Sequence, residues 1–265
     1  MSQAEHSPLR SRSFKTTRTV VALVFREMAT TYGRSAAGYI WAVAEPVAGI
    51  ILLTAIFSLA FESPPLGTSF PLFYASGYLP FTMYLDISNK VANSIRFSKP
   101  LLFYPGVTYF DAILARFILN GLTQVMVTLI VVPAIILLFR VKVIIDIPAL
   151  ALGLLMAAVL ALGVGTLNCF LITAVPSWER IWAILNRPLF IISAIFFVFE
   201  SVPNPYRDWL WFNPLVHVIG QVRKGVFPTY DADYVSYIYL FGVSGAALFF
   251  GLLLLGRFHR DLINS

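Results

Sequence analysis

The chain has 265 residues, of which 58% are hydrophobic and only 12% are charged, and its mean hydropathy is +0.80. A soluble domain carries roughly 25% charged residues, so this composition excludes an ordinary soluble protein and indicates an integral membrane protein. The single cysteine, Cys169, excludes an internal disulfide and a metal site built from several cysteines. The three histidines are far apart in the sequence, and we expect no metal site and no cofactor in this chain.

Residues 1–35 are expected to form a basic cytoplasmic tail followed by an amphipathic helix. In "FKTTRTVVALVFREMATTY" the apolar side chains recur at helical spacing, whereas most charged ones fall on the other face. Because this segment leads almost directly into a span, we interpret it as a helix lying in the membrane interface. The alternative is a solvated helix packed on the protein. The apolar run 20–25 is too short for the core of a cleaved signal.

Six later stretches are long and apolar enough to cross a membrane, since a spanning helix needs about 20 mainly apolar residues. The predicted spans are 37–61, 70–93, 109–139, 148–174, 182–200 and 234–256. The fold class is therefore an all-α integral membrane protein, with one six-span domain over 36–256 and a cytoplasmic tail over 257–265.

Basic residues predict the orientation of these spans. If the N-terminus is cytoplasmic, fourteen of the 19 Lys and Arg residues lie on the cytoplasmic side, as the positive-inside rule requires. An even number of spans then places both termini in the cytoplasm.

The first predicted span contains an unusual pair, Glu45 and Pro46, within "GYIWAVAEPV". A carboxylate in a membrane helix is costly unless it faces the protein interior or meets a cation, and the proline removes a backbone hydrogen bond. We expect a bent helix whose carboxylate meets Arg34, Arg96 or Arg116. The pair either fixes helix packing or forms a gate that rearranges.

Two connectors have more large apolar side chains than plain loops need. The cytoplasmic connector over 94–107, within "NSIRFSKPLLFYPGVTYFD", is expected to form a short helix that rests on another protein. The alternative is an interfacial loop with aromatic anchors.

The outer connector over 201–230 is rich in Trp, Tyr, Phe and Pro and apolar in its middle. It is expected to be a re-entrant helical hairpin, which requires cover from protein or a water-filled cavity.

Catalytic signatures are missing from the sequence. It contains no G-x-x-x-x-G-K-[ST] phosphate loop, no H-E-x-x-H and no G-x-S-x-G. Asp231 and Asp233 form an isolated D-x-D that we interpret as a solvated helix start. We therefore expect a chain that is not itself an enzyme.

Two stretches resemble type-2 ABC transporter permeases. "REMATTYGRSAAGYIWAVAEPV" resembles the start of that family's first span, and "NPLVH" followed by an arginine resembles its segment between the fifth and sixth spans. The matching positions are Arg26, Tyr32, Ser35, Gly38, Trp41, Pro46, Asn213, Pro214, Leu215, His217 and Arg223. Length and span number agree, and within the family the sequence is most similar to the KpsM-type permeases of capsular polysaccharide export.

The resemblance implies half of a transporter in the bacterial inner membrane. Two copies would form the channel, two copies of a separate ATPase would bind ATP and Mg, and periplasmic or outer-membrane export proteins would complete the path. The substrate would be a lipid-linked polysaccharide, and membrane lipids are further partners; no nucleic acid is expected.

The resemblance also assigns roles to residue groups. The ATPase-coupling group is Arg96, Phe97, Lys99, Leu101, Leu102 and Phe103. The cytoplasmic gate through which substrate enters is Arg26, Arg34, Tyr39, Trp41 and Glu45. The outer gate is Tyr206, Trp209, Trp211, Phe212 and His217, where aromatic faces would stack on sugar rings.

Three other interpretations remain open from the sequence. The cargo could be O-antigen or teichoic acid rather than capsule. A membrane-embedded transferase acting on lipid-linked sugars would need clustered acidic or histidine residues at one membrane face, and no motif joins those present. A structural membrane subunit without a transport role is the third.

Overall fold

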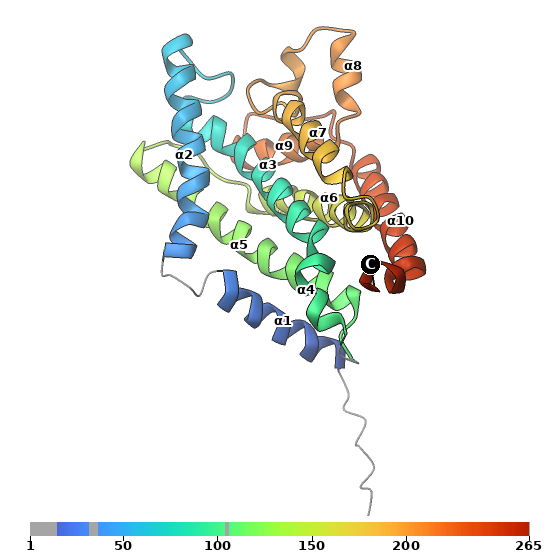
Figure 1. Ribbon diagram of the computed structural model, residues 1–265. Coiled ribbons are helices and arrows are strands. Elements are labelled where there is room, and N and C mark those ends of the chain that lie inside the picture. Colours follow the sequence, from blue (N-terminus) through green and yellow to red (C-terminus); the bar gives the residue numbers. More distant parts are fainter. Residues whose placement is uncertain (1–14, 32–36, 104–105, 265) are drawn as a thin grey trace, which may run out of the picture.

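The computed structural model describes residues 15–31, 37–103 and 106–264, and all secondary structure in those ranges is helical. The elements are α1 (Lys15–Thr31), α2 (Ala37–Ala60), α3 (Phe70–Ala92), α4 (Ser94–Leu102), α5 (Tyr109–Leu138), α6 (Ile147–Ala174), α7 (Trp178–Ile192), η1 (Phe199–Ser201), α8 (Tyr206–Trp211), α9 (Pro214–Val226) and α10 (Tyr237–Asn264). The prediction of an all-helical fold is confirmed (Figure 1).

Side chains at the helix starts explain several of these boundaries. Ser69, Asp146 and Asn213 each accept a hydrogen bond from a backbone N–H in the first turn of α3, α6 and α9, and each is followed by proline within two residues. Thr108 and Asp111 form a reciprocal capping box at α5. Such caps satisfy N–H groups that have no partner within the helix.

Four helices are long and apolar enough to cross a membrane, and they lie within the described parts of α2, α5, α6 and α10. This confirms four of the six predicted spans. Helix α3 occupies its predicted range but carries Asp86, Asn89 and Lys90, which lower its hydropathy. Helix α7 has only 15 residues. The number of spans is therefore not settled by length and composition.

The predicted range of the fifth span, 182–200, is wrong at both ends. Helix α7 begins at Trp178 and ends at Ile192, and the chain then turns through Ala194, which has a left-handed φ of 61°. A residue in that conformation commonly ends a helix. Carbonyl groups just after this helix end accept hydrogen bonds from a buried arginine of α9, described below. Residues distant in the sequence therefore stabilise the helix end.

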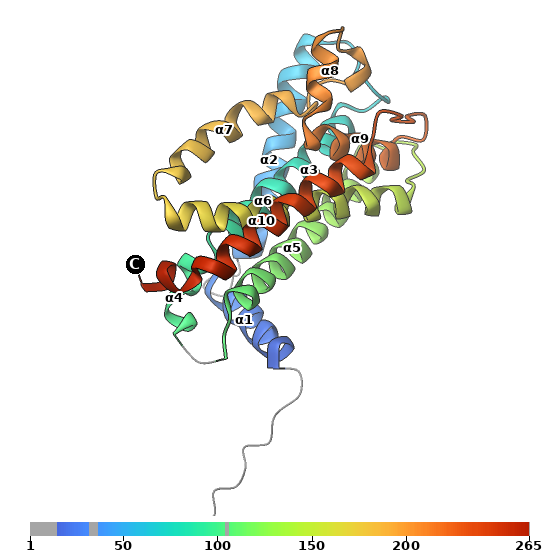
Figure 2. The same cartoon turned by 90° about the vertical axis from the view of Figure 1, so that its right-hand side faces the viewer.

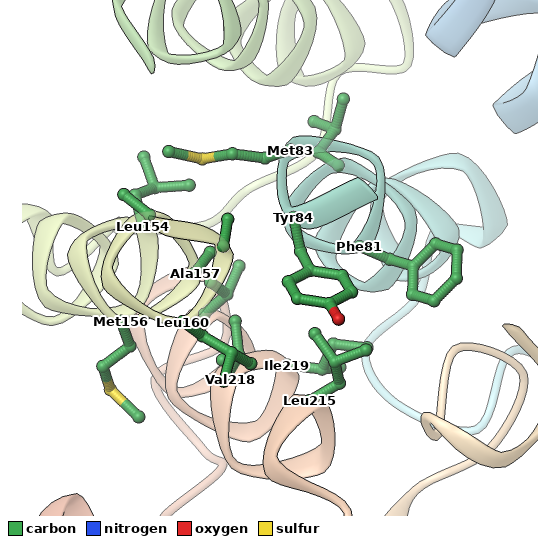
Figure 3. Close-up of a cluster of buried hydrophobic side chains, with 14 of the residues drawn as sticks. Phe81, Met83, Tyr84, Leu154, Met156, Ala157, Leu160, Leu215, Val218 and Ile219 are labelled. Carbon is green, nitrogen blue, oxygen red and sulfur yellow. The ribbon is translucent and has the colours of Figure 1, made fainter. Parts of the chain in front are cut away.

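Helices α3, α6 and α9 form the centre of the bundle. Their facing side chains interlock in one buried layer, shown in Figure 3. The labelled members are Phe81, Met83, Tyr84, Leu154, Met156, Ala157, Leu160, Leu215, Val218 and Ile219. Helix α10 packs along α6, where Gly163 lies directly against the Ser244 carbonyl oxygen. Close approach of this kind needs small residues at the contact.

The two ends of the bundle carry different elements. Helices α1 and α4 lie at one end, together with the C-terminal end of α10, whereas η1 and α8 lie at the other (Figures 1 and 2). Helix α1 lies within the range predicted for the amphipathic helix, and its place in a membrane interface stays a prediction. Val20 and Leu23 pack against Ala115 of α5, while Val21 and Phe25 are exposed. Helix α1 therefore packs on the protein and still presents an apolar outer face.

Candidate functional site

A cleft of about 900 Å³ lies between α2, α3, α5 and α7. One part of its lining is aromatic, with Trp41, Tyr78, Phe81 and Phe190. The other part is polar, with Glu45, Thr82, Asp86, Asn89, Lys90, Thr123, Gln124 and Asn186. A lining that combines aromatic rings with amides, hydroxyls and charges suits a ligand that has both apolar faces and hydroxyl groups, as sugars do.

Helix α3 supplies much of the polar wall. Thr82, Asp86 and Asn89 recur at intervals of three or four, so they share one face of the helix. The opposite face carries buried Met83, Tyr84 and other apolar residues. Gln124 of α5 donates a hydrogen bond to Asp86, with Nε2 and Oδ2 3.1 Å apart, which fixes the carboxylate at the cleft wall. This face was missed from the sequence, although the spacing of polar residues inside an apolar span was a usable signal.

The predicted cytoplasmic gate is only partly brought together. Trp41 and Glu45 both line the cleft, and the Trp41 side chain is exposed. Arg26 instead lies on α1, with its guanidinium 5.8 Å from the Phe97 ring centroid. Arg34 and the side chain of Tyr39 fall outside the described residues.

The expectation that Arg96 or Arg116 meets Glu45 is wrong. Arg116 forms an ion pair with Glu27 of α1, and Arg96 forms one with Glu179 of α7. Glu45 has no ion-pair partner among the residues that the structure describes. Its carboxylate faces the cleft instead, where water can solvate it.

Arg116 joins four helices at the end of the bundle that carries α1 and α4. Its Nε lies 3.1 Å from Glu27 Oε1, its Nη1 donates to the Lys90 carbonyl of α3 at 2.9 Å, and its guanidinium stacks on Phe97 of α4 at 4.0 Å. Both charged side chains of the pair are almost fully buried. Burial raises the pKa of Glu27, against the opposing effect of the Arg116 charge.

The predicted coupling residues occupy α4 and the residue that follows it. Leu101 packs with the α1–α5 cluster and Leu102 with the main core, and both are half-buried. Arg96, Phe97 and Phe103 are exposed. The Phe103 side chain is 62% exposed, more than Leu101 and Leu102 beside it. Lys99 is half-buried. The helix thus has one face fixed to the bundle and one apolar and basic face left open.

The outer segment is held to the bundle by the residues of the Asn-Pro-Leu-x-His motif. Asn213 accepts from the Leu215 N–H and donates to the Ile192 carbonyl, which links the start of α9 to the end of α7. Buried Arg223 donates to the Phe197 and Ile195 carbonyls at 2.6 and 2.9 Å and stacks on Phe73. These bonds satisfy carbonyls left free where α7 breaks.

The predicted outer gate divides into two groups. His217 is buried, with Nε2 2.8 Å from the Trp211 carbonyl oxygen and Nδ1 accepting from the Ser236 N–H. The half-buried Trp211 indole donates to the Tyr234 carbonyl. Tyr206, Trp209 and Phe212 are exposed at the surface. Two of the five side chains therefore anchor the segment, and three are free to meet lipid, substrate or protein.

No group of three or more His, Cys, Asp or Glu side chains is placed to hold a metal ion in the described ranges. A comparison with protein families matches residues 18–227 to the ABC-2 type transporter family.

The chain belongs to the ABC-2 type transporter family.

Curated relatives refine this result. The chain is 33% identical over 247 residues to the polysialic acid transport protein KpsM of Escherichia coli, covering 93% of this chain and 96% of the relative. It is 24% identical to the capsule polysaccharide export inner-membrane protein CtrC of Neisseria meningitidis, with 92% of each chain covered. A similar match, at 23%, is found with BexB of Haemophilus influenzae, again covering 92% of both chains.

The division of the outer aromatics predicts different effects on stability. Trp211→Ala removes a ring that contacts His217 and Tyr239 and loses the bond to Tyr234, so it should destabilise by about 2–3 kcal/mol. Trp209→Ala changes a 74% exposed side chain and should cost less than about 0.5 kcal/mol. Thermal unfolding in detergent measures both, and equal losses would contradict the division.

Proposed function

We propose that this chain is the transmembrane subunit of an ATP-driven exporter that moves lipid-linked capsular polysaccharide across the bacterial inner membrane. The observation that carries the proposal is similarity over nearly the whole chain to three relatives named for polysialic acid or capsule polysaccharide export. The cleft supports it, because its aromatic and polar walls suit a sugar chain better than a small apolar molecule.

Six helices would cross the membrane in this proposal: α2, α3, α5, α6, α7 and α10. The polar face of α3 lies toward the cleft and α5, and its apolar face lies in the core, so lipid need not meet its charges. The short α7 would cross with the non-helical residues 193–198 that follow it. Those residues are covered by α9, as irregular backbone in a membrane must be.

Both termini would be cytoplasmic, and the segment over 201–230 would be the outer re-entrant hairpin. The distribution of Lys and Arg supports this orientation. The arrangement of the bundle agrees with it, because α1, α4 and the C-terminal end of α10 share one end while α8 lies at the other (Figures 1 and 2).

A second copy of the chain would close the cleft into a conduit. Helices α2 and α7, which border the cleft, expose many large apolar side chains, and α7 has no buried residue. The exposed apolar residues on these two helices include Ile40, Trp41, Ile51, Leu52, Ile56, Ile184, Leu185, Ile191 and Ile192. Such surfaces suit a partner helix as well as lipid. Trp41 and Glu45 would form the cytoplasmic gate of this conduit.

The energy would come from two copies of a separate ATPase that binds ATP and Mg and docks on the open face of α4. Periplasmic or outer-membrane export proteins would receive the glycan at the α8 end. No step of this proposal requires chemistry by the chain itself, which holds and moves the glycan while the partner hydrolyses ATP.

A deletion strain tests the proposed cargo. Without the chain, we expect long lipid-linked capsular polysaccharide to accumulate inside the cell while the surface loses it, because synthesis continues without a route outward. Expression of the chain from a plasmid should reverse both effects. Loss of surface O-antigen or teichoic acid with normal capsule would overturn the capsule assignment.

Charge at Phe103 should weaken ATPase docking. Phe103→Asp places a carboxylate on the open apolar face of α4, and a docking surface that depends on a few apolar anchors loses much of its affinity when one is charged. Co-purification of the ATPase with the chain measures the effect. Phe61→Asp, at a similarly exposed phenylalanine at the opposite end of the bundle, is the matched control (Figure 1). Equal recovery of the ATPase with both variants would remove Phe103 from the interface.

A further inference from the structure

Helix α7 is attached to the bundle mainly at its ends. None of its residues is buried, yet it supplies Asn186 and Phe190 to the cleft. Its C-terminal end is held by Asn213, as described above. Figure 2 shows α7 extending away from α6 along most of its length. A wall fixed only at its ends can move without disturbing the core.

Two side-chain bonds hold the cytoplasmic end of α7. The Trp178 indole donates to Asn168 of α6 at 2.8 Å. Glu179, in the first turn, accepts from Arg96 of α4, with Oε2 and Nη1 2.9 Å apart. The first bond ties α7 to the core, and the second ties it to α4, whose open face is the proposed ATPase surface.

Helix α4 can act on α7 only through a specific contact. Its buried residues, Ser94, Ile95 and Ser98, face the bundle, while Arg96 extends from the opposite side toward Glu179. Among the described residues, this ion pair is the polar side-chain contact that joins the two helices. It therefore links the proposed ATPase surface directly to the α7 side of the cleft.

We propose that Glu179 is a positioning residue that transmits movement of α4 to α7, and so to the cleft wall that carries Asn186 and Phe190. The proposal rests on the function proposed above. Both side chains are about half exposed, so the pair adds little to folding stability. The pair instead connects one side chain of α4 to one side chain of α7. A docked ATPase would shield this pair from water and so strengthen it.

Charge reversal tests the link in the complete complex of chain and ATPase. Glu179→Arg and Arg96→Glu should each lower glycan export per ATP hydrolysed by about fivefold or more. The double variant Arg96→Glu/Glu179→Arg should return it to near the wild-type value. Glu179→Arg alone also places a cation at the N-terminus of α7, which is unfavourable. That cation persists in the double variant, so recovery there can come only from the restored pair.

Arg180→Glu is the matched control, because it reverses an exposed charge in the same helical turn and should leave coupling unchanged. Normal coupling in Glu179→Arg, or a double variant as impaired as the single ones, would overturn the proposal.

A second readout separates this proposal from the cargo assignment. An environment-sensitive fluorophore on Leu185→Cys reports movement of α7 and needs no glycan; Leu185 is exposed and the native Cys169 is buried. The emission change on ATP addition should disappear in Glu179→Arg and return in the double variant. If it does so in a chain that exports no capsular glycan, the link stands and the proposed function falls. An unchanged response in Glu179→Arg would overturn the link whatever the cargo.

Discussion

The buried ion pair between Arg116 and Glu27 is the constraint on which the α1–α4 end of the bundle depends. One guanidinium on α5 contacts a carboxylate of α1, a carbonyl of α3 and an aromatic ring of α4. Taking both charges from water is costly, and an apolar pair of the same size could be equally stable. The arrangement instead gives specificity, because a planar group with several donors meets three different partners only in one geometry.

That geometry relates the membrane interface to the cleft. Helix α1 presents Val21 and Phe25 outward, α4 presents Phe103 toward the proposed ATPase surface, and Lys90 of α3 lines the cleft. Arg116 connects the backbone or side chains of all three helices. The opposite end is organised differently: Arg223 and Asn213 donate hydrogen bonds to carbonyls at the break after α7, so the direct hydrogen-bond partners of the buried arginine are backbone carbonyls.

Sequence reasoning identified most helices because their apolar residues form long runs. The ranges of α2, α5 and α6 agree with prediction to within a residue, and family membership followed from motif spacing. The end of α7 could not be predicted in the same way. It depends on Ala194 adopting a left-handed conformation and on Arg223, 29 positions later, satisfying the exposed carbonyls.

Ionic partners were the least predictable part of the site. The sequence predicts that Arg34, Arg96 and Arg116 all lie on the same side of the membrane as Glu45, and this does not distinguish between them as its partner. Nothing in the spacing linked Arg116 to Glu27, 89 positions earlier. The sequence likewise did not distinguish the anchoring Trp211 from the exposed Trp209. The direction of the Trp211 ring depends on its contacts with His217, six positions later, and with Tyr234, 23 positions later. The roles predicted for the gate residues remain predictions.

Hydrogen exchange in the Arg116→Met variant tests most directly whether this arginine holds α1 and α4 to the bundle. Removing one partner of a buried pair leaves the other charge unpaired. We predict faster amide exchange in both α1 and α4, with exchange in α9 unchanged because that helix has its own bracing at the other end. In Glu27→Leu/Arg116→Met, α1 should regain protection, whereas α4 should not, since Phe97 still lacks the closer of its two cations, Arg116. Unchanged exchange in α1 and α4 of the single variant, or an equal increase throughout the chain, would contradict the account.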